Sequence, residues 1–260
     1  METFINRNGL KLEYSVTQGS IPFVFLHGLG GSALQIEKLY EPIDDVSLIL
    51  LNQQGHGNSE YDYSNLSFDI LADDVADLLD HFNIGQVYIA GISMGAAVAL
   101  NFSLRYPERV RKALLIRNAW VDRPIRKEIT DVYHDLAEAL KNKDKEQFLQ
   151  SPGYQHVKDI SEYTRNSFLK PFGEEYNVRV YEKYTVIPEL VPIRNIDDLK
   201  TINKPVEIIA CRNDLCHPYE YGVTLHELIP GSHFTEVPDK DTDQETHERL
   251  INDVIRKMLK

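Results

Sequence analysis

The chain has 260 residues, a length that is sufficient for one large α/β domain with an insertion. Hydrophobic residues make up 42% of it and charged residues 26%, as in ordinary globular proteins. The formal net charge of −12 argues against proteins that bind nucleic acids or anionic membrane surfaces, because both kinds of partner require a basic patch.

Targeting signals and cysteine usage indicate where the protein works. The N-terminal residues lack the basic start and apolar core of a signal peptide, and no apolar stretch reaches membrane-spanning length. The only two cysteines, Cys211 and Cys216, lie five residues apart around a predicted loop, which indicates reduced thiols. His217 alone does not complete a metal site with them. We therefore expect a cytoplasmic protein with no metal site and with neither nucleic acid nor membrane as a partner.

Short apolar runs alternate with segments of helical periodicity along most of the chain. The first two runs flank an Asn8-Gly9 turn and predict a β-hairpin. The predicted strands are 3–6, 10–16, 23–26, 47–51, 87–90, 112–116, 204–210 and 234–237. Predicted helices are 67–82, 96–106, 219–229 and an amphipathic C-terminal helix that ends at Lys260. Strands that are apolar on both faces and alternate with helices predict a mostly parallel, twisted sheet flanked by helices.

The alternation stops between residues 121 and 196. This stretch reads as helical, contains many aromatic residues and shows no strand pattern. Because it separates two strands of one sheet, we expect a helical lid at 121–196 on a core domain formed by 1–120 and 197–260. Most of its aromatic side chains are expected to pack the core of the lid, and together they predict an apolar ceiling over a pocket.

The most informative motif is Gly91-Ile92-Ser93-Met94-Gly95, which lies between a predicted strand and an Ala-rich helix. A serine on a sharp strand-to-helix turn needs a small residue two positions to either side, because the backbone doubles back there. Such a turn holds the hydroxyl above the sheet, at a helix N-terminus that favours negative charge. The motif therefore predicts Ser93 as a catalytic nucleophile.

A second loop is rich in glycine and runs from His27 to Ser32. Its backbone amides can approach a bound oxygen without obstruction by side chains, as an oxyanion hole requires. The two donors we expect are the amides of Leu29 and of Met94, the residue after the serine. A phosphate-binding loop is the alternative, but neither Gly-x-Gly-x-x-Gly nor Gly-Lys-Ser/Thr is completed here.

With these motifs the chain resembles the α/β-hydrolase family over nearly its whole length. His27–Gly30 is similar to the oxyanion loop of that family, Gly55–Ser59 to its G-x-G-x-S loop, and Gly91–Gly95 to its nucleophile elbow. Asp214 begins a D-x-x-x-P pattern after a late strand, where such proteins keep the triad acid. The resemblance implies an α/β-hydrolase fold and makes Asp214 the carboxylate that orients the catalytic base.

The sequence departs from the family at two places. Asn52 and Gln54 stand where an aspartate and an arginine usually precede the G-x-G-x-S loop, which is mainly structural. More seriously, no histidine directly follows the last strand, so the base has to come from elsewhere. We expect it to be His247, in the first turns of the final helix. His217 is the alternative, although it stands too near Asp214 in sequence to be an easy partner.

The resemblance implies a cofactor-free serine hydrolase of carboxylesterase type. Ser93 would attack a carbonyl carbon, His247 would take its proton, and Asp214 would hold the imidazole. The expected substrate is a small, rather apolar molecule cleaved at an ester or at a related acyl or carbon–carbon bond. The alternative is a non-catalytic ligand-binding or signalling protein on the same scaffold, suggested by the missing histidine after the last strand.

Overall fold

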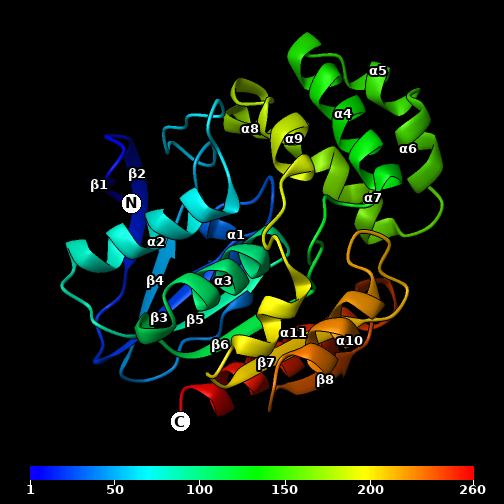
Figure 1. Ribbon diagram of the computed structural model, residues 1–260. Coiled ribbons are helices and arrows are strands. Elements are labelled where there is room, and N and C mark those ends of the chain that lie inside the picture. The colour runs from blue at the N-terminus through cyan, green and yellow to red at the C-terminus, as the bar shows by residue number, and fades with distance from the viewer.

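The computed structural model describes residues 1 to 260 and contains one eight-stranded sheet (Figure 1). The strand order is β1-β2-β4-β3-β5-β6-β7-β8. The strands are β1 (Glu2–Ile5), β2 (Lys11–Val16), β3 (Ile21–Leu26), β4 (Val46–Leu51), β5 (Val87–Ile92), β6 (Val110–Ile116), β7 (Val206–Cys211) and β8 (His233–Val237). All eight predicted strands are therefore confirmed, with small shifts at their ends.

The sheet is mostly parallel, as predicted. Only the β1–β2 and β2–β4 pairs are antiparallel, and the five pairs from β4 across to β8 are parallel. The carboxyl ends of β3 to β8 consequently lie at one edge of the sheet. Loops that follow these strands meet there, which is where ligands bind in open α/β sheets.

Helices cover both faces of this sheet (Figure 1). On β3, Phe23 and Phe25 belong to an apolar cluster that includes side chains of α1 and α11. Val24 and Leu26 point the other way, into a larger cluster with α2 and α3, because successive side chains of a strand face opposite sides. The flanking helices are α1 (Ala33–Leu39), α2 (Phe68–His81), α3 (Met94–Arg105), α10 (Tyr219–Leu228) and α11 (Lys240–Met258).

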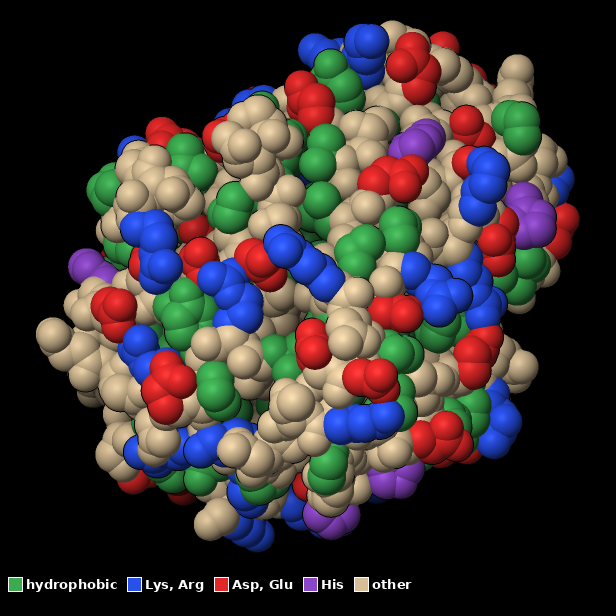
Figure 2. Space-filling model, in the orientation of Figure 1, with side chains coloured by type: hydrophobic (Ala, Val, Ile, Leu, Met, Phe, Trp, Pro, Cys, Tyr) green, Lys and Arg blue, Asp and Glu red, His purple; other side chains and the backbone are tan.

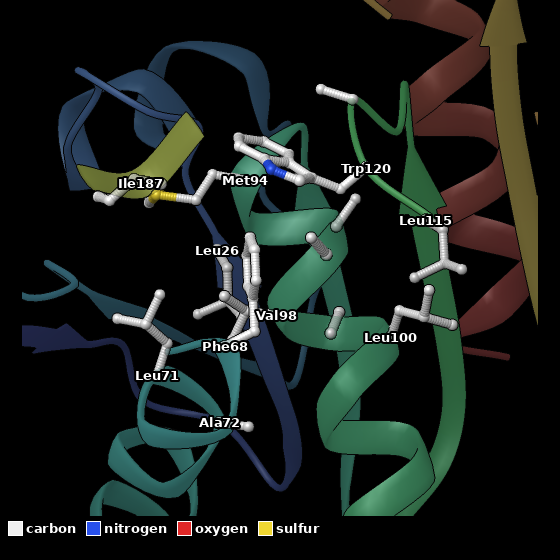
Figure 3. Packing of buried hydrophobic residues seen from close by; sticks show 14 of the residues in the cluster. Leu26, Phe68, Leu71, Ala72, Met94, Val98, Leu100, Leu115, Trp120 and Ile187 are labelled. Carbon is white, nitrogen blue, oxygen red and sulfur yellow. The ribbon is translucent and has the colours of Figure 1, made fainter. Parts of the chain in front are cut away.

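The start of α3 is anchored in the larger cluster. Figure 3 shows Met94 among Leu26, Phe68 and Trp120, and all four side chains are fully buried. The rings of Phe68 and Trp120 meet edge to face, with their centroids 5.4 Å apart. This packing fixes the turn that precedes α3, where Ser93 lies.

Residues 121–196, which we call the helical segment, contain only helices and turns. Figure 1 shows these helices gathered in the upper part of the view, beyond one edge of the sheet. They are α4 (Lys127–Asn142), α5 (Lys145–Leu149), α6 (Pro152–Val157), α7 (Glu162–Leu169), α8 (Glu175–Arg179) and α9 (Lys183–Val186). Side chains of α8 and α9 bond to the loops after β3 and β4, so the segment reaches the edge where the parallel strands end.

Three details differ from the sequence-based expectations. Helix α1 was not predicted, because its seven residues are too few to show a periodic pattern. Helix α3 begins at Met94 rather than at residue 96, directly after Ser93. Helix α11 is interrupted at Asp243 (φ −157°, ψ 85°), so that His247 belongs to the part after the kink. None of the helices has both the length and the apolar character needed to cross a membrane.

Candidate active site

Ser93 occupies a strained turn between β5 and α3. Its backbone angles are φ 55° and ψ −112°, a conformation that costs energy for a residue with a side chain. The turn is close-packed: a Cβ on Gly91 would overlap the carbonyl of Gly95, and one on Gly95 would overlap the carbonyl of Leu26. The backbone amide of Ser93 donates to the carbonyl of Ile116 at 3.0 Å, which ties the turn to β6.

In the glycine-rich loop after β3, the amides of the three glycines are paired within the protein and the amide of Leu29 is not. Gly28 donates its amide to Gln35 Oε1 at 2.8 Å, Gly30 to His56 Nε2 at 3.1 Å, and Gly31 to the carbonyl of Gly28 at 3.0 Å. The amide of Leu29 makes no such bond. The amide of Met94, at the first position of α3, has no carbonyl one turn earlier in its helix to bond.

Two buried histidines hold this loop in place. His56 Nδ1 lies 3.0 Å from the carbonyl of Gln54, so that Nε2 is the acceptor for the Gly30 amide. His27 Nδ1 lies 2.9 Å from the carbonyl of Gly28, and its Nε2 accepts from the Gln53 amide at 3.1 Å. Burial lowers the pKa of both imidazoles, that of His27 to about 4, so both are neutral at pH 7. Their role in the structure is to fix the loops after β3 and β4.

The helical segment holds the same loop from the other side. Asn177 Nδ2 donates to the carbonyl of Gly30 at 3.1 Å, and Tyr176 Oη donates to it at 3.2 Å. Lys183 is fully buried and donates to the carbonyl of Gly55 at 2.9 Å. Burial lowers the pKa of Lys183 to about 7. Gly30 is thus hydrogen-bonded through both its amide and its carbonyl, and it directly follows Leu29, whose amide is unpaired.

His247 is fully buried and lines a cavity of about 390 Å³ together with Leu29 and Ile92, the residue before the serine. Its Nδ1 lies 2.7 Å from the carbonyl of Pro238, and its Nε2 has no partner. A carbonyl oxygen can only accept, so the proton is on Nδ1 and Nε2 is left as a proton acceptor. Burial, followed by the charge of Arg117, lowers the pKa of His247 to about 4.

Asp214 is not hydrogen-bonded to His247. Its carboxylate accepts from Arg117 Nε at 2.7 Å and lies 2.9 Å from His217 Nδ1. Burial opposes ionisation of Asp214, but the charges and hydrogen bonds of His217 and Arg117 outweigh it and hold its pKa far below the ordinary range. The expected contact between this carboxylate and the imidazole of His247 is therefore not present, because both groups have other partners.

His217 was not expected to be an easy partner for Asp214, which stands three residues before it, but the structure pairs the two. Asp214 Oδ1 accepts the backbone amides of both Cys216 and His217 at 3.2 Å, which folds the loop back on its own carboxylate. That turn brings the His217 imidazole alongside. His217 does not line the cavity, whereas His247 does.

Arg117, which was not among the predicted site residues, directly follows β6 with a φ of 52° and lines the cavity. A charged residue directly after the apolar run at 113–116, which ends the strand, is the signal that could have identified it. Both cysteines are free and buried, with Cys211 Sγ 3.6 Å from Asp214 Oδ2. No group of three or more His, Cys, Asp or Glu residues is arranged to hold a metal ion.

A family model described as alpha/beta hydrolase fold matches residues 21–247. The AB hydrolase superfamily protein YisY of Bacillus subtilis (strain 168) is 26% identical over 230 residues, which cover 80% of this chain and 82% of that protein. A probable alcohol acetyltransferase of Cyberlindnera fabianii is 32% identical over 106 residues, which cover 40% of this chain and 29% of the relative. The chain thus spans less than a third of that acetyltransferase.

Solved structures show the same fold. An esterase from Exiguobacterium antarcticum superposes with a TM-score of 0.75 at 19% identity, covering 99% of each chain. A structure described as an N-acyl homoserine lactone degrading enzyme superposes with a TM-score of 0.75 at 21% identity, covering 97% of this chain and 98% of that one. At these identities the likeness establishes the architecture alone.

Proposed function

Because this chain belongs to the α/β hydrolase fold family, we propose that it is a cofactor-free serine hydrolase of carboxylesterase type. The observation that carries the proposal is the cavity beside the strained turn: Ile92, the residue before Ser93, lines it, although Ser93 itself does not. The unpaired amide of Leu29 and the unpaired Nε2 of His247 belong to residues that line this one cavity. Activation of a hydroxyl requires such an acceptor, and an oxyanion requires such a donor.

In the proposed reaction Ser93 Oγ attacks the carbonyl carbon of an ester while His247 Nε2 takes the hydroxyl proton. The amides of Leu29 and Met94 hold the oxygen on which negative charge develops. The alcohol leaves with the proton from His247, and a water molecule then cleaves the acyl–enzyme by the same steps. A related acyl or carbon–carbon bond would be cleaved with the same groups.

Asp214 has a less direct part in this proposal than sequence analysis assigned to it. The carbonyl of Pro238 holds the Nδ1 proton of His247 and so sets its tautomer. The negative charge of Asp214 raises the pKa of His247 through space, against the larger effects of burial and of Arg117. We propose that this charge helps to stabilise the imidazolium without a hydrogen bond.

Two structural neighbours are described as an esterase and as an N-acyl homoserine lactone degrading enzyme, which is in keeping with this reaction class. We propose that the helical segment acts as the lid of the site. Tyr133, Phe168 and Tyr184 line the cavity from this segment and offer apolar surface to a small substrate.

Labelling with a fluorophosphonate tests the nucleophile. We expect wild-type protein to be labelled and Ser93→Ala not to be, with hydrolysis of p-nitrophenyl butyrate lowered at least ~10³-fold in the variant. Ser103→Ala is the matched control, since this α3 serine uses its hydroxyl on the carbonyl of Ala99 at 2.7 Å. Wild-type protein that is neither labelled nor active would refute the proposal.

Substitution of the two candidate histidines tests the base. His247→Ala is expected to lower turnover at least ~10³-fold, because Ser93 is a poor nucleophile when no base takes its proton. His217→Ala is expected to cost much less, since its imidazole faces Asp214 and does not line the cavity. The reverse order of losses would transfer the role of base to His217.

A second candidate function is ligand binding without turnover. It is favoured by one observation: the carboxylate of Asp214 is engaged by Arg117 and His217 and does not contact His247. Tight binding of small esters by a protein that Ser93-directed probes do not label would support this candidate.

A further inference from the structure

The cavity beside Ser93 has a charge balance opposite to that of the whole chain. The sequence holds 28 Lys and Arg residues and 40 Asp and Glu residues. Figure 2 shows both signs interspersed over the visible face of the molecule. The cavity lining, in contrast, includes the cations Lys38, Arg117, Lys170 and Lys240 but a single carboxylate, Glu248. Such a reversal favours an anionic ligand, because a cleft lined by one sign of charge concentrates the other.

Arg117 is the deepest of these cations. Its side chain is 9% exposed, and its Nε and Nη2 atoms are engaged with the buried carboxylate of Asp214. Nη1 makes no hydrogen bond within the protein, although a guanidinium carries five donors in a fixed fork. Arg117 directly follows Ile116, whose carbonyl accepts the amide of Ser93, so this cation belongs to the strand beside the nucleophile.

Lys240 and Tyr163 complete a cluster with Arg117. Lys240 Nζ donates to Tyr163 Oη at 3.0 Å and lies 4.5 Å from the centre of the same ring. The guanidinium of Arg117 lies 5.8 Å from that ring centre. Burial would raise the pKa of Tyr163, but the two cations outweigh it and lower that pKa.

The other charged residues that line the cavity do not occupy all the hydrogen-bond donors of this cluster. Lys170 is paired with Glu174 at 3.2 Å, outside the cluster. Glu248 lies 3.7 Å from Lys240, so it occupies at most one of the three donors of the ammonium group. One Lys240 donor is already used by Tyr163, so Arg117 Nη1 and at least one further donor of Lys240 remain for a ligand.

We propose that Arg117, Lys240 and the hydroxyl of Tyr163 form a carboxylate-binding subsite. The substrate would then be an ester of a short dicarboxylic acid, with its free carboxylate at this subsite and its ester carbonyl at Ser93. The inference rests on the proposed hydrolase function and names its substrate class. An Arg–carboxylate contact in a site of low exposure is among the stronger polar interactions in proteins.

Matched esters test the subsite. The p-nitrophenyl monoester of succinic acid and p-nitrophenyl butyrate have acyl groups of the same chain length and differ in charge. We expect the ratio of their kcat/KM values to favour the succinate ester in wild-type protein and to fall about tenfold or more in Lys240→Met. Lys240→Arg is expected to restore most of the ratio. Lys127→Met removes an exposed lysine paired with Asp131 and should leave the ratio unchanged.

A ratio that Lys240→Met does not change would overturn the subsite even if both esters are hydrolysed. If neither ester is hydrolysed, the proposed function fails, and calorimetry with monomethyl succinate decides the subsite separately. Binding to Ser93→Ala that weakens at high salt and is lost when Lys240→Met is added would support it. Absence of binding to Ser93→Ala would overturn it.

Discussion

At the scale of single residues, His247 shows how its surroundings set the chemistry available to it. Full burial and the nearby charge of Arg117 both disfavour its charged form, so the imidazole is neutral at physiological pH. A neutral imidazole can accept the proton of Ser93. The resulting imidazolium is less stable in this environment than in water, and a bound carboxylate near Arg117 and Lys240 would stabilise it.

This environment predicts the pH dependence of the reaction. The active form of His247 is the neutral one, so kcat/KM for p-nitrophenyl butyrate should fall as the pH drops through about 4. Between pH 5 and 8 His247 should contribute no inflection, in place of a rise near the ordinary histidine value of ~6.5. Lys183→Met removes the buried amine whose pKa is about 7, so an inflection that is due to Lys183 disappears in this variant. Steady-state kinetics measure the profile, and tryptophan fluorescence over the same range shows whether the fold persists. An inflection near ~6.5 that remains in Lys183→Met would contradict the assigned environment of His247.

Asp214 is expected to matter more for stability than a surface carboxylate does. Asp214→Asn leaves the buried Arg117 without its counter-charge, which costs on the order of 3 kcal/mol in free energy of unfolding. The folded-state pKa of Asp214 is lowered, so its contribution is present at pH 7 and is lost only as the pH falls below the ordinary Asp range. Urea unfolding at pH 7 measures the difference.

Asp131→Asn is the control for this prediction, because its pair with Lys127 is exposed on α4. Exposed pairs contribute at most about 1 kcal/mol. Equal losses for the two variants would show that the Asp214–Arg117 pair is not stabilising in its buried setting.

At the scale of elements, hydrogen bonds hold α8 and the loop after β3 together. Asn177 is fully buried: its Nδ2 donates to the carbonyl of Gly30 and to Glu174, and its Oδ1 accepts from Tyr184. The bond from Asn177 to the Gly30 carbonyl and the bond from the Gly30 amide to His56 together fix the position of Gly30. Gly30 directly follows Leu29, the proposed oxyanion donor. An oxyanion donor is effective only when it is held in position before the reaction.

Asn177→Ala should therefore lower kcat about tenfold or more while changing KM little, since the oxyanion is present only in the transition state. The rate of labelling by a fluorophosphonate should fall in parallel. Asn142→Ala provides the comparison, because this α4 residue bonds only to the exposed side chains of Glu138 and Gln147. A rise in KM with unchanged kcat would mean that Asn177 shapes substrate binding instead.

Local sequence patterns predict the elements well and their side-chain partners poorly. The strands and the serine turn depend on neighbouring residues, so apolar runs and Gly-x-Ser-x-Gly are sufficient for them. The partner of Asp214 depends on packing between segments: Arg117 stands 97 positions earlier in the chain. The bond between His247 and the Pro238 carbonyl likewise depends on the kink at Asp243, which no periodic pattern indicates.

At the scale of the whole molecule, the helical segment and the sheet jointly enclose the cavity. Leu29 and Arg117 contribute from loops after parallel strands, and Tyr133 and Phe168 contribute from α4 and α7. The rings of Tyr133 and Phe168 meet edge to face with centroids 5.1 Å apart. The helical segment thus contributes aromatic rings to the wall, while Arg117 follows β6 and Lys240 begins α11. The apolar part of a substrate would then lie against the aromatic rings, and its charged part would lie near Arg117 and Lys240.

This arrangement predicts that Phe168 limits the length of the acyl chain. Phe168→Ala should raise kcat/KM for p-nitrophenyl hexanoate relative to p-nitrophenyl acetate several-fold, because it opens apolar space next to Tyr133. Its reaction with a small fluorophosphonate should change less, since the serine, its base and the oxyanion amides are untouched. Phe172→Ala is the matched control from the same segment, as its ring packs on Phe148 and does not line the cavity. Thermal unfolding of both variants separates loss of stability from altered preference. Equal changes in chain-length preference for the two variants would mean that the segment affects the site only through its overall stability.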